Sequence, residues 1–310
     1  MPTESEMLDF FVQWGASRPE VRALVLTSTR TVPGADVDRL SDYDLIVAVS
    51  DPPGIRPFFE SRLWLEDFGH VLVLYQDPIR PWFSPGEGGP ALDPPDEKFA
   101  YITQFDEAGL KIDFTVMPAA LLQRIAAAPL SPDLDLGYRV LLDKDGLTAG
   151  MAPPTHRAFI PSPPSPAEFV QAVELFFHEC TYLAKYIWRG DLLPAKAHLE
   201  AAIKNDELRR VLEWQVEIER GWTLRLKAHG RGLQKVLRPE VWAELEATYV
   251  GGAGPEASWE ALWRTAALFE KTARGVAAAL GYAYPEEMHQ RSMAYLRWVQ
   301  ALPPDADSRW

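Results

Sequence analysis

The stretch that decides the fold is Ser41-Asp42-Tyr43-Asp44-Leu45-Ile46-Val47-Ala48-Val49, in which two acidic residues lead into an apolar run. Residues two apart on a strand point to the same face, so Asp42 and Asp44 are expected to project together. Neighbouring carboxylates repel each other unless a positive charge lies between them. Mg²⁺ prefers oxygen ligands and often binds through one or two carboxylates plus substrate phosphates. The stretch therefore predicts a metal-dependent enzyme that handles a nucleoside triphosphate, although acidic pairs also flank loops or cap helices.

Two neighbouring segments support the metal-dependent interpretation. An apolar strand candidate at 24–26 runs into the small hydroxyl residues Thr27, Ser28 and Thr29. A later strand candidate, Leu110-Lys111-Ile112-Asp113-Phe114-Thr115-Val116, places a further acid among apolar residues. Aspartate is depleted in strands and is costly to bury without a partner. Asp113 is therefore expected to belong to the same site as the first two acids.

Composition limits the class of protein. The 310 residues predict about two domains, and the hydrophobic fraction of 47% is ample for two cores. No apolar run approaches the ~20 residues of a membrane span, and the acidic start, Met1-Pro2-Thr3-Glu4-Ser5-Glu6, does not resemble a signal peptide. The single cysteine, Cys180, excludes an internal disulfide. A cytoplasmic protein without a membrane partner is expected.

The charge is distributed unevenly along the chain. Residues 1–150 carry 24 acidic and 12 basic residues, whereas residues 151–310 carry 20 and 19. An acidic surface without a basic stripe argues against nucleic-acid binding. It would attract a small polycationic substrate, although acidity also serves solubility alone.

A proline-rich stretch divides the chain. Six prolines fall between Pro153 and Pro166, and such a segment cannot hold a helix or a central strand. Before it, strand-like runs at 24–26, 44–49, 70–75, 110–117 and 139–142 mix with helical patterns at 4–16, 55–66 and 118–127. After it, helices are expected at 167–189, 193–202, 205–228, 239–249, 257–280 and 285–300, with Ser165 as the cap of the first. The fold class is therefore α+β. A mixed-sheet domain with flanking helices is expected at 1–150, a linker at 151–166 and an all-α helical bundle at 167–310.

Motifs spread over some 280 residues make the chain resemble the aminoglycoside 6-adenylyltransferases (streptomycin adenylyltransferases), within the polymerase β-like nucleotidyltransferase superfamily. From the N-terminal side to the end of the proline-rich stretch they are Ser41-Asp42-Tyr43-Asp44, Trp64-Leu65, Phe68-Gly69, Pro94-Pro95-Asp96-Glu97-Lys98, Lys111-Ile112-Asp113, Leu142-Asp143-Lys144-Asp145 and Pro164-Ser165-Pro166. In the second half they are Tyr182 with Lys185, Asn205-Asp206-Glu207-Leu208, Trp214, Trp259-Glu260-Ala261-Leu262 and Tyr282-Ala283-Tyr284-Pro285.

The resemblance implies a nucleotidyltransferase domain followed by a helical domain that binds substrate and nucleotide. The implied reaction transfers AMP from ATP, with Mg²⁺, to the 6-hydroxyl of streptomycin and releases pyrophosphate, which confers antibiotic resistance. Asp42, Asp44 and Asp113 would be catalytic and would bind the metal, with Asp113 acting as a ligand of a second metal or as the base that accepts the hydroxyl proton.

The nucleotide would be bound from both domains. Ser28, Thr29 and Arg30 would cradle its phosphates. Ser28 stands where the family normally has glycine, which tolerates a positive φ and lets a backbone approach the triphosphate.

The helical domain supplies weaker candidates. His178, Tyr182, Lys185 and Arg189 recur at helical spacing and share one stripe, which is either a solvated polar face or a cleft-facing one. By the resemblance, Lys185 would bind the β- and γ-phosphates, with Arg189 beside it. Glu213 is a weaker candidate for binding the cationic groups of an acceptor, because glutamates on a helix are often only solvated. Glu97, in the first domain, is a second weak candidate for the same role.

Two other functions remain open at the level of sequence. The chain could transfer a nucleotide to a different acceptor, such as another antibiotic, a metabolite or a protein hydroxyl. It could also bind nucleotide without turnover, because Ser28 replaces the usual glycine, although retention of all three acids argues against that. A monomer is expected, and the sequence leaves the oligomeric state open.

Overall fold

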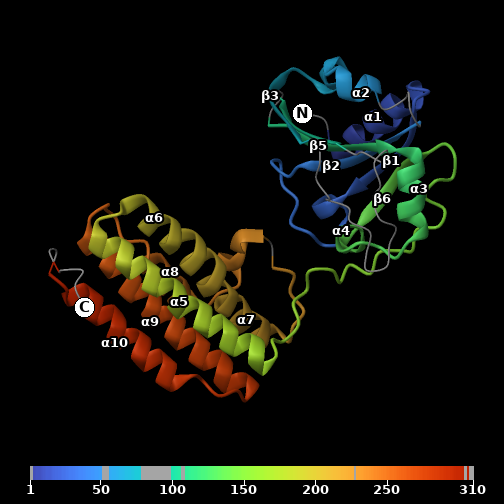
Figure 1. Cartoon of the computed structure of the whole chain (residues 1–310). Helices are drawn as coiled ribbons and strands as arrows, with labels where there is room; N and C mark the ends of the chain where they lie inside the picture. Colours follow the sequence, from blue (N-terminus) through green and yellow to red (C-terminus); the bar gives the residue numbers. More distant parts are fainter. Residues whose placement is uncertain are drawn as a thin grey trace. The chain divides into compact units, whose positions relative to one another are not determined.

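The computed structural model describes residues 3–50, 56–77, 99–105, 109–226, 228–303 and 306. The chain folds into two compact units, Met1–Phe159 (the first unit) and Ile160–Trp310 (the second unit). Within the described residues the first unit contains a six-stranded sheet and helices, and the second contains helices only (Figure 1). The α+β prediction is confirmed. The limits 1–150, 151–166 and 167–310 stay a prediction, and residues 151–165 contain no helix or strand.

The sheet of the first unit is mixed. Strands β2 and β5 run parallel, whereas every other neighbouring pair is antiparallel, in the order β3-β4-β5-β2-β1-β6. The strands are β1 (Val21–Thr27), β2 (Tyr43–Val49), β3 (Val71–Asp77), β4 (Phe99–Phe105), β5 (Lys111–Pro118) and β6 (Tyr138–Asp143). Strand β4 was missed in the sequence.

Each face of this sheet has its own core. Helix α1 (Glu4–Ser17) packs Phe11 and Trp14 against one face, in the same core as Phe114 of β5. Helix α3 (Ala119–Ala127) packs Leu121 and Leu122 against the other face, where Ile46 and Ala48 of β2 also point. Because side chains alternate along a strand, Asp44 falls on the face that α3 covers. The alternation of β2 therefore sets where its carboxylate lies.

Local signals explain where several helices begin. The hydroxyl of Thr3 and the carboxylate of Glu6 form a capping box at the start of α1. Ser131 caps the short helix α4 (Pro132–Leu136), which lies on the same side of the sheet as α3. The predicted helix at 55–66 is wrong: the described chain there forms a short α2 (Arg56–Glu60) and a separate 3-10 helix, η2 (Leu63–Phe68). The side chains of η2 anchor the aromatic core, so tertiary packing overrides the helical pattern.

The second unit is a bundle built around one long helix, α5 (Pro166–Arg189). Ser165 caps it, as the sequence predicted, and Gly190 ends it in the left-handed conformation. Phe176 of α5 stacks on Phe269 with ring centroids 3.6 Å apart. The remaining helices are α6 (Leu192–Ala197), the π-helix η3 (His198–Leu208), α7 (Arg209–Arg220), the 3-10 turns η4 (Ala228–Gly230) and η5 (Leu233–Lys235), α8 (Pro239–Ala247), α9 (Pro255–Leu280) and α10 (Glu286–Ala301).

The predicted boundaries inside the second unit need two corrections. Residues 192–220 are continuously helical rather than broken near residue 203, because no glycine or proline interrupts 195–220. The helix expected to reach residue 228 ends at Arg220, where Gly221 adopts φ 68°.

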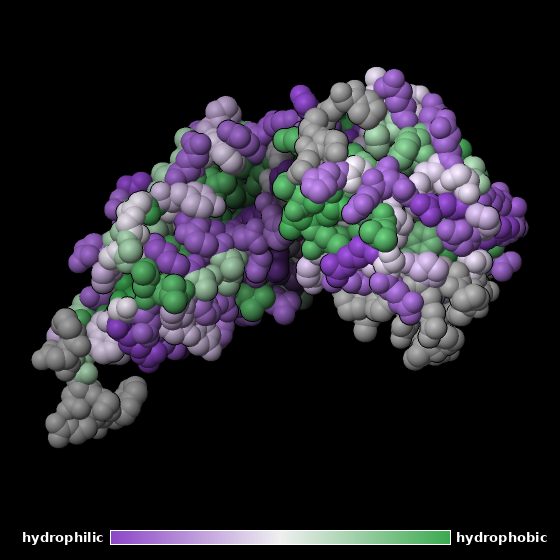
Figure 2. All heavy atoms as spheres, turned by 90° about the horizontal axis from the view of Figure 1, so that it is seen from above, coloured by the Kyte–Doolittle hydropathy of each residue, from purple (hydrophilic) through white to green (hydrophobic). Residues whose placement is uncertain are grey.

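The visible surfaces are mostly polar. In Figure 2 purple side chains cover much of each unit, with smaller green areas among them. In the part of the chain that the structure describes, every helix is too short or too polar to cross a membrane.

Candidate active site

Two of the predicted acids lie side by side on parallel strands. Asp44 of β2 is the register partner of Asp113 of β5, so the two carboxylates are held at the same level of the sheet. Asp42 lies one residue before β2, two positions from Asp44. The structure therefore brings all three predicted acids together at the beginning of β2.

A lysine connects two of these acids. The Nζ of Lys111 donates hydrogen bonds to Oδ2 of Asp42 at 2.6 Å and to Oδ2 of Asp113 at 2.8 Å. Lys111 lies two residues before Asp113 on β5 and therefore points to the same face. Burial acts to lower the pKa of Lys111, but the bonds to Asp113 and Asp42 outweigh it and raise that pKa. Lys111 is thus a firmly protonated bridge between the carboxylates.

The negative charge of the three carboxylates is only partly balanced by Lys111. Burial, together with the charges of Asp113 and Asp42, raises the pKa of Asp44 to about 6, against the opposing effects of Ser28 and Lys111. Burial also raises the pKa of Asp113, although Lys111 works against this. The Oδ1 atom of Asp113 is buried and has no hydrogen-bond partner among the described residues. One lysine therefore does not satisfy three carboxylates.

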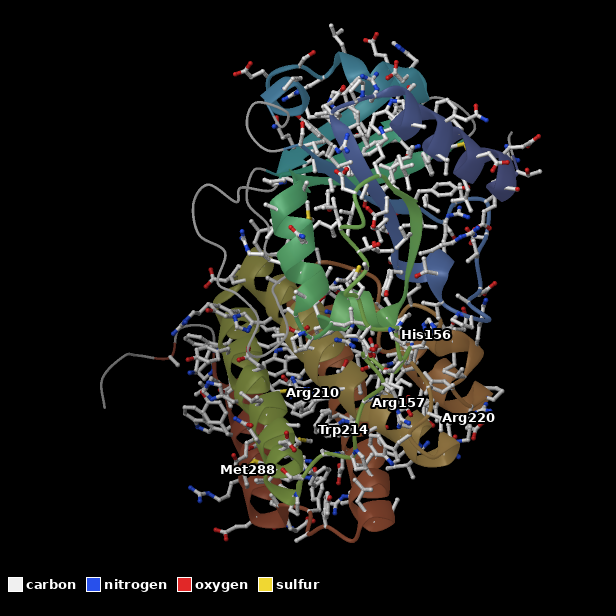
Figure 3. The ribbon with its side chains drawn as sticks, turned by 90° about the vertical axis from the view of Figure 1, so that its right-hand side faces the viewer. His156, Arg157, Arg210, Trp214, Arg220 and Met288 are labelled. Atoms are coloured by element: carbon white, nitrogen blue, oxygen red, sulfur yellow. The ribbon has the colours of Figure 1, made fainter. Side chains whose placement is uncertain are left out.

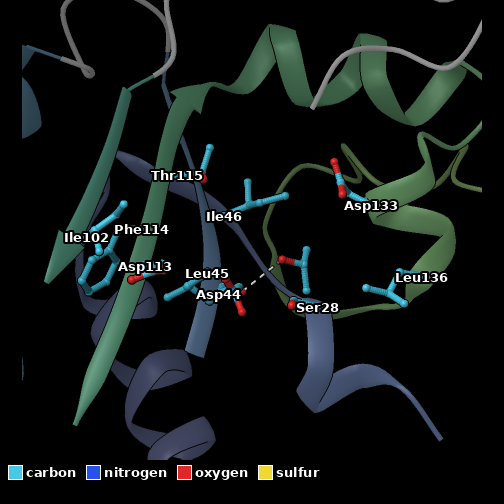
Figure 4. Close-up of a pocket in the computed structure, with 11 residues that line it drawn as sticks. Ser28, Asp44, Leu45, Ile46, Ile102, Asp113, Phe114, Thr115, Asp133 and Leu136 are labelled. Atoms are coloured by element: carbon cyan, nitrogen blue, oxygen red, sulfur yellow. Dashed lines mark hydrogen bonds between the residues drawn. The ribbon is translucent and has the colours of Figure 1, made fainter. Parts of the chain in front are cut away.

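A small cavity opens beside these acids. Its volume is about 90 Å³, and Ser28, Asp44, Asp113 and Asp133 are among the residues that line it (Figure 4). A pocket for a drug-sized ligand usually has about 300–1,000 Å³. This cavity can hold an ion with a few water molecules, but not a nucleotide.

Ser28 opens the 3-10 helix η1 (Ser28–Thr31) at the end of β1. Its φ is +65°, in the left-handed region that favours glycine. The preceding Thr27 donates its hydroxyl to the backbone carbonyl of Asp44 at 3.3 Å, and the hydroxyl of Thr31 donates to the carbonyl of Ser28 at 2.7 Å. Ser28 therefore adopts a backbone conformation that favours glycine, at a conformational cost. Thr29 follows it directly on η1.

Arg30 is turned into the first unit. Its Nε donates to the carbonyl oxygen of Asp42 at 2.9 Å, and one of its terminal nitrogens donates to the carbonyl of Ser41 at 2.6 Å. Its guanidinium also lies 3.8 Å from the ring centroid of Tyr43, and its side chain is only 7% exposed. Arg30 thus clamps the segment that carries the first two acids, and its predicted contact with phosphates stays a prediction.

The two cationic candidates of the second unit, Lys185 and Arg189, lie on α5. Lys185 of α5 has its Nζ 4.9 Å from the ring of Tyr182. Arg189 lies in the last turn of α5, where it lines a surface groove with Trp259 and Trp263. Because these residues belong to a separate unit, their roles toward the nucleotide stay predictions.

The two glutamate candidates have different outcomes. Glu213 of α7 accepts a hydrogen bond from Nη1 of Arg209 at 2.6 Å, and burial raises its pKa. Figure 3 shows its neighbours Arg210 and Trp214 on the same helix. Glu97 lies outside the described residues.

The residue that sequence reasoning missed is Lys111. It belongs to the strand candidate and to the family motif, yet neither gave it a role of its own. The signal was present in its spacing, since a cation two residues before Asp113 on a strand must share the face of that acid. Its contact with Asp42, 69 residues away along the chain, depends on the pairing of β2 with β5.

Comparisons with known proteins place this sequence in a family. The sequence profile of the streptomycin adenylyltransferase family matches residues 1–299. An aminoglycoside 6-adenylyltransferase of Bacillus subtilis (strain 168) is 28% identical over 286 residues, which cover 92% of this chain and 94% of that protein. The protein of the same name from Campylobacter jejuni is 26% identical, with 92% of each chain covered. A crystal structure of an aminoglycoside 6-adenyltransferase from Bacillus subtilis has a TM-score of 0.46 and 24% identity, and it covers 97% of this chain and 100% of that one.

Proposed function

Because this chain belongs to the streptomycin adenylyltransferase family, we propose that it transfers AMP from ATP to a hydroxyl group of an aminoglycoside, with Mg²⁺, and releases pyrophosphate. The chain is an enzyme of the adenylyltransferase type, as its relatives are. The observation that carries the proposed chemistry is the pair of carboxylates, Asp44 and Asp113, held in register on parallel strands with Asp42 beside them.

The residues present suit a divalent cation. Asp42, Asp44 and Asp113 would hold it, because all three offer the hard oxygen ligands that Mg²⁺ prefers. The buried, unpartnered Oδ1 of Asp113 is an acceptor that lacks a positive or hydrogen-bonding neighbour among the described residues. When bound, the cation would polarise the phosphate oxygens and neutralise their charge.

The protein's own groups would orient the acids and the phosphates and take up the proton of the attacking hydroxyl. Arg30 holds the carbonyls of Ser41 and Asp42, so the carboxylate of Asp42 starts from a fixed backbone. Asp113 would either be a ligand of a second cation or accept the proton of the attacking hydroxyl. Ser28 and Thr29 would cradle the phosphates where η1 begins, with Lys185 and Arg189 as further cations from the second unit.

The acceptor class rests on charge and on relatives. The proteins named aminoglycoside 6-adenylyltransferase share 26–28% identity with this chain over nearly its whole length. Aminoglycosides are polycations, and residues 1–150 carry twice as many acidic as basic residues. Glu97 and Glu213 would meet ammonium or guanidinium groups of this acceptor. Streptomycin, at its 6-hydroxyl, is the specific acceptor we propose.

The test is an assay of pyrophosphate release with purified protein, ATP, Mg²⁺ and streptomycin. We expect release that requires the antibiotic and that falls at least about a hundredfold in Asp42→Asn, because a metal ligand is lost. Asp9→Asn, on the exposed face of α1, is the matched control and should retain activity. Release that is independent of any aminoglycoside, or that survives Asp42→Asn, would overturn the proposal. Release with another aminoglycoside but not with streptomycin would change the acceptor and keep the chemistry.

A further inference from the structure

The bridge formed by Lys111 has the geometry of a cation site. A single ammonium nitrogen lies 2.6 Å from the carboxylate of Asp42, which is 69 residues away in the chain, and 2.8 Å from that of Asp113. Oxygens of the same two side chains would be needed by a divalent cation. The ammonium and a divalent cation would compete for those oxygens, because two positive centres at short range repel each other in a partly buried site.

The orientation of the carboxylate oxygens agrees with a lysine in the position of a cation. Among the described residues, no group of three or more His, Cys, Asp and Glu side chains is arranged to hold a metal ion as it stands. One oxygen each of Asp42 and Asp113 is instead turned to Lys111, whereas Oδ1 of Asp113 is left without a partner in this part of the chain. Lys111 therefore engages one oxygen of each of these two carboxylates.

The charge of the cluster also favours binding of a divalent cation. Three carboxylates and one ammonium leave a net charge of two negative units when all four groups are ionised, which one divalent cation would balance as long as the ammonium stays nearby after it leaves the two oxygens. The side chain of Lys111 is 27% exposed, so its ammonium can turn from the carboxylates towards solvent without crossing the core. Lysine suits such a part because its compact charge sits on a flexible stem.

We propose that Lys111 is the resident counter-ion of the metal-free site, which holds Asp42 and Asp113 together and is displaced from their oxygens when the divalent cation binds. Lys111 is in this sense a positioning residue that opposes the metal. The inference rests on the proposed metal-dependent function, and it adds that the lysine weakens metal binding while it stabilises the acids whenever no cation is bound to them.

The test measures metal binding without nucleotide or acceptor. Mn²⁺ is titrated calorimetrically into the wild-type protein, Lys111→Met and Lys111→Arg, with Lys271→Met as the matched control. Lys271 pairs with Glu244 on the exposed surface of the second unit, so its loss removes an ion pair far in sequence from the acids. Melting temperatures are recorded with chelator and with saturating Mn²⁺.

We expect Lys111→Met to bind Mn²⁺ about tenfold more tightly than the wild type, because the competing charge is gone. Its melting temperature with chelator should be lower than that of the wild type, and Mn²⁺ should raise it by more. Lys111→Arg and Lys271→Met should bind as the wild type does. If Lys111→Met proves insoluble, Lys111→Gln provides the same measurement.

The contrary outcomes separate the two proposals. Unchanged or weaker Mn²⁺ binding in Lys111→Met, with wild-type binding that is lost in Asp113→Asn, would overturn the counter-ion inference and leave the metal site intact. Mn²⁺ binding by none of the folded proteins would overturn the proposed metal site and this inference with it.

Discussion

Asp44 and Asp113 are register partners on the parallel strands β2 and β5, so two carboxylates stand side by side on the one pair of neighbouring strands in the described sheet that runs parallel. Burial and this neighbouring charge raise the pKa of Asp44 to about 6. The pair explains why the site needs positive charge, whether from Lys111 or from a metal.

The stability of the protein should depend on pH through Asp44. The pKa of Asp44 is about 6 in the folded protein against an ordinary 3.8, so folding favours its protonated form. Its stabilising contribution is complete below pH ~4 and is lost as the pH rises through ~6. In Asp44→Asn the free energy of unfolding at pH 7.5, with chelator present, should exceed that of the wild type by about 1–3 kcal/mol. Denaturant titrations at pH 4 and 7.5 measure this.

Asp145→Asn is the control for this prediction, because its effect on stability should have the opposite sign. The hydrogen bond from Arg22 lowers the pKa of Asp145, so Asp145→Asn should lose stability at neutral pH instead of gaining it. A difference between Asp44→Asn and the wild type that stays the same from pH 4 to 7.5 would contradict the assignment to Asp44.

Ser28→Gly should stabilise the protein. At φ +65° a side chain costs about 1 kcal/mol relative to glycine, and the greater entropy of glycine in the unfolded chain cancels part of the gain. We expect a net increase of about 0.5 kcal/mol in the free energy of unfolding. Thermal unfolding provides the measurement, and the pyrophosphate assay shows whether the relaxed loop also raises turnover.

Ser165→Gly is the matched control for Ser28→Gly. Ser165 caps α5 at φ −66°, an ordinary value, so glycine there removes a cap and brings no relief. Its stability should fall by a few tenths of a kcal/mol. Equal effects of the two substitutions would mean that the backbone at Ser28 is not strained.

Arg30→Met should impair both stability and catalysis. The substitution leaves the carbonyls of Ser41 and Asp42 without their donors and removes the cation over the ring of Tyr43. Loss of charged hydrogen bonds in a buried setting costs about 1–3 kcal/mol. We expect a tenfold or greater decrease in kcat (about 1.4 kcal/mol) with a smaller change in the KM for ATP, since Asp42 is displaced.

Arg22→Met is a suitable comparison for Arg30→Met. Arg22 forms a surface ion pair with Asp145. Its replacement should lower the free energy of unfolding by about 1 kcal/mol or less and leave kcat unchanged. A rise in the KM for ATP at unchanged kcat in Arg30→Met would instead support the direct phosphate contact expected from the sequence.

Lys185→Met tests the cation of the second unit. The observed contact of Lys185 is with the exposed ring of Tyr182, so stability should change by less than about 1 kcal/mol. If the ammonium binds the triphosphate, the KM for ATP should rise about tenfold or more. Steady-state kinetics over a range of ATP concentrations measure this, and Lys271→Met again serves as the neutral control. An unchanged KM would remove Lys185 from the proposed site.

The sequence predicted the parts of this protein that depend on local chemistry. An apolar run identified β2, acids among apolar residues identified β5, and Ser165 with Pro166 marked the start of α5. It misjudged the segment of η2, where aromatic packing overrides a helical pattern, and it missed β4, which is recognised through its pairing with β3 and β5. Local propensity carries no information on such pairing.

The sequence by itself determined that three acids, a strand-to-loop hydroxyl segment and a helical second half occur in one chain, because residue types and periodicity are local properties. Only the tertiary structure decided that Asp44 is beside Asp113, that Lys111 lies between Asp42 and Asp113, and that Arg30 holds backbone carbonyls. The reason is physical: these relationships join residues through strand register and burial, and register is set when the whole sheet closes its two cores.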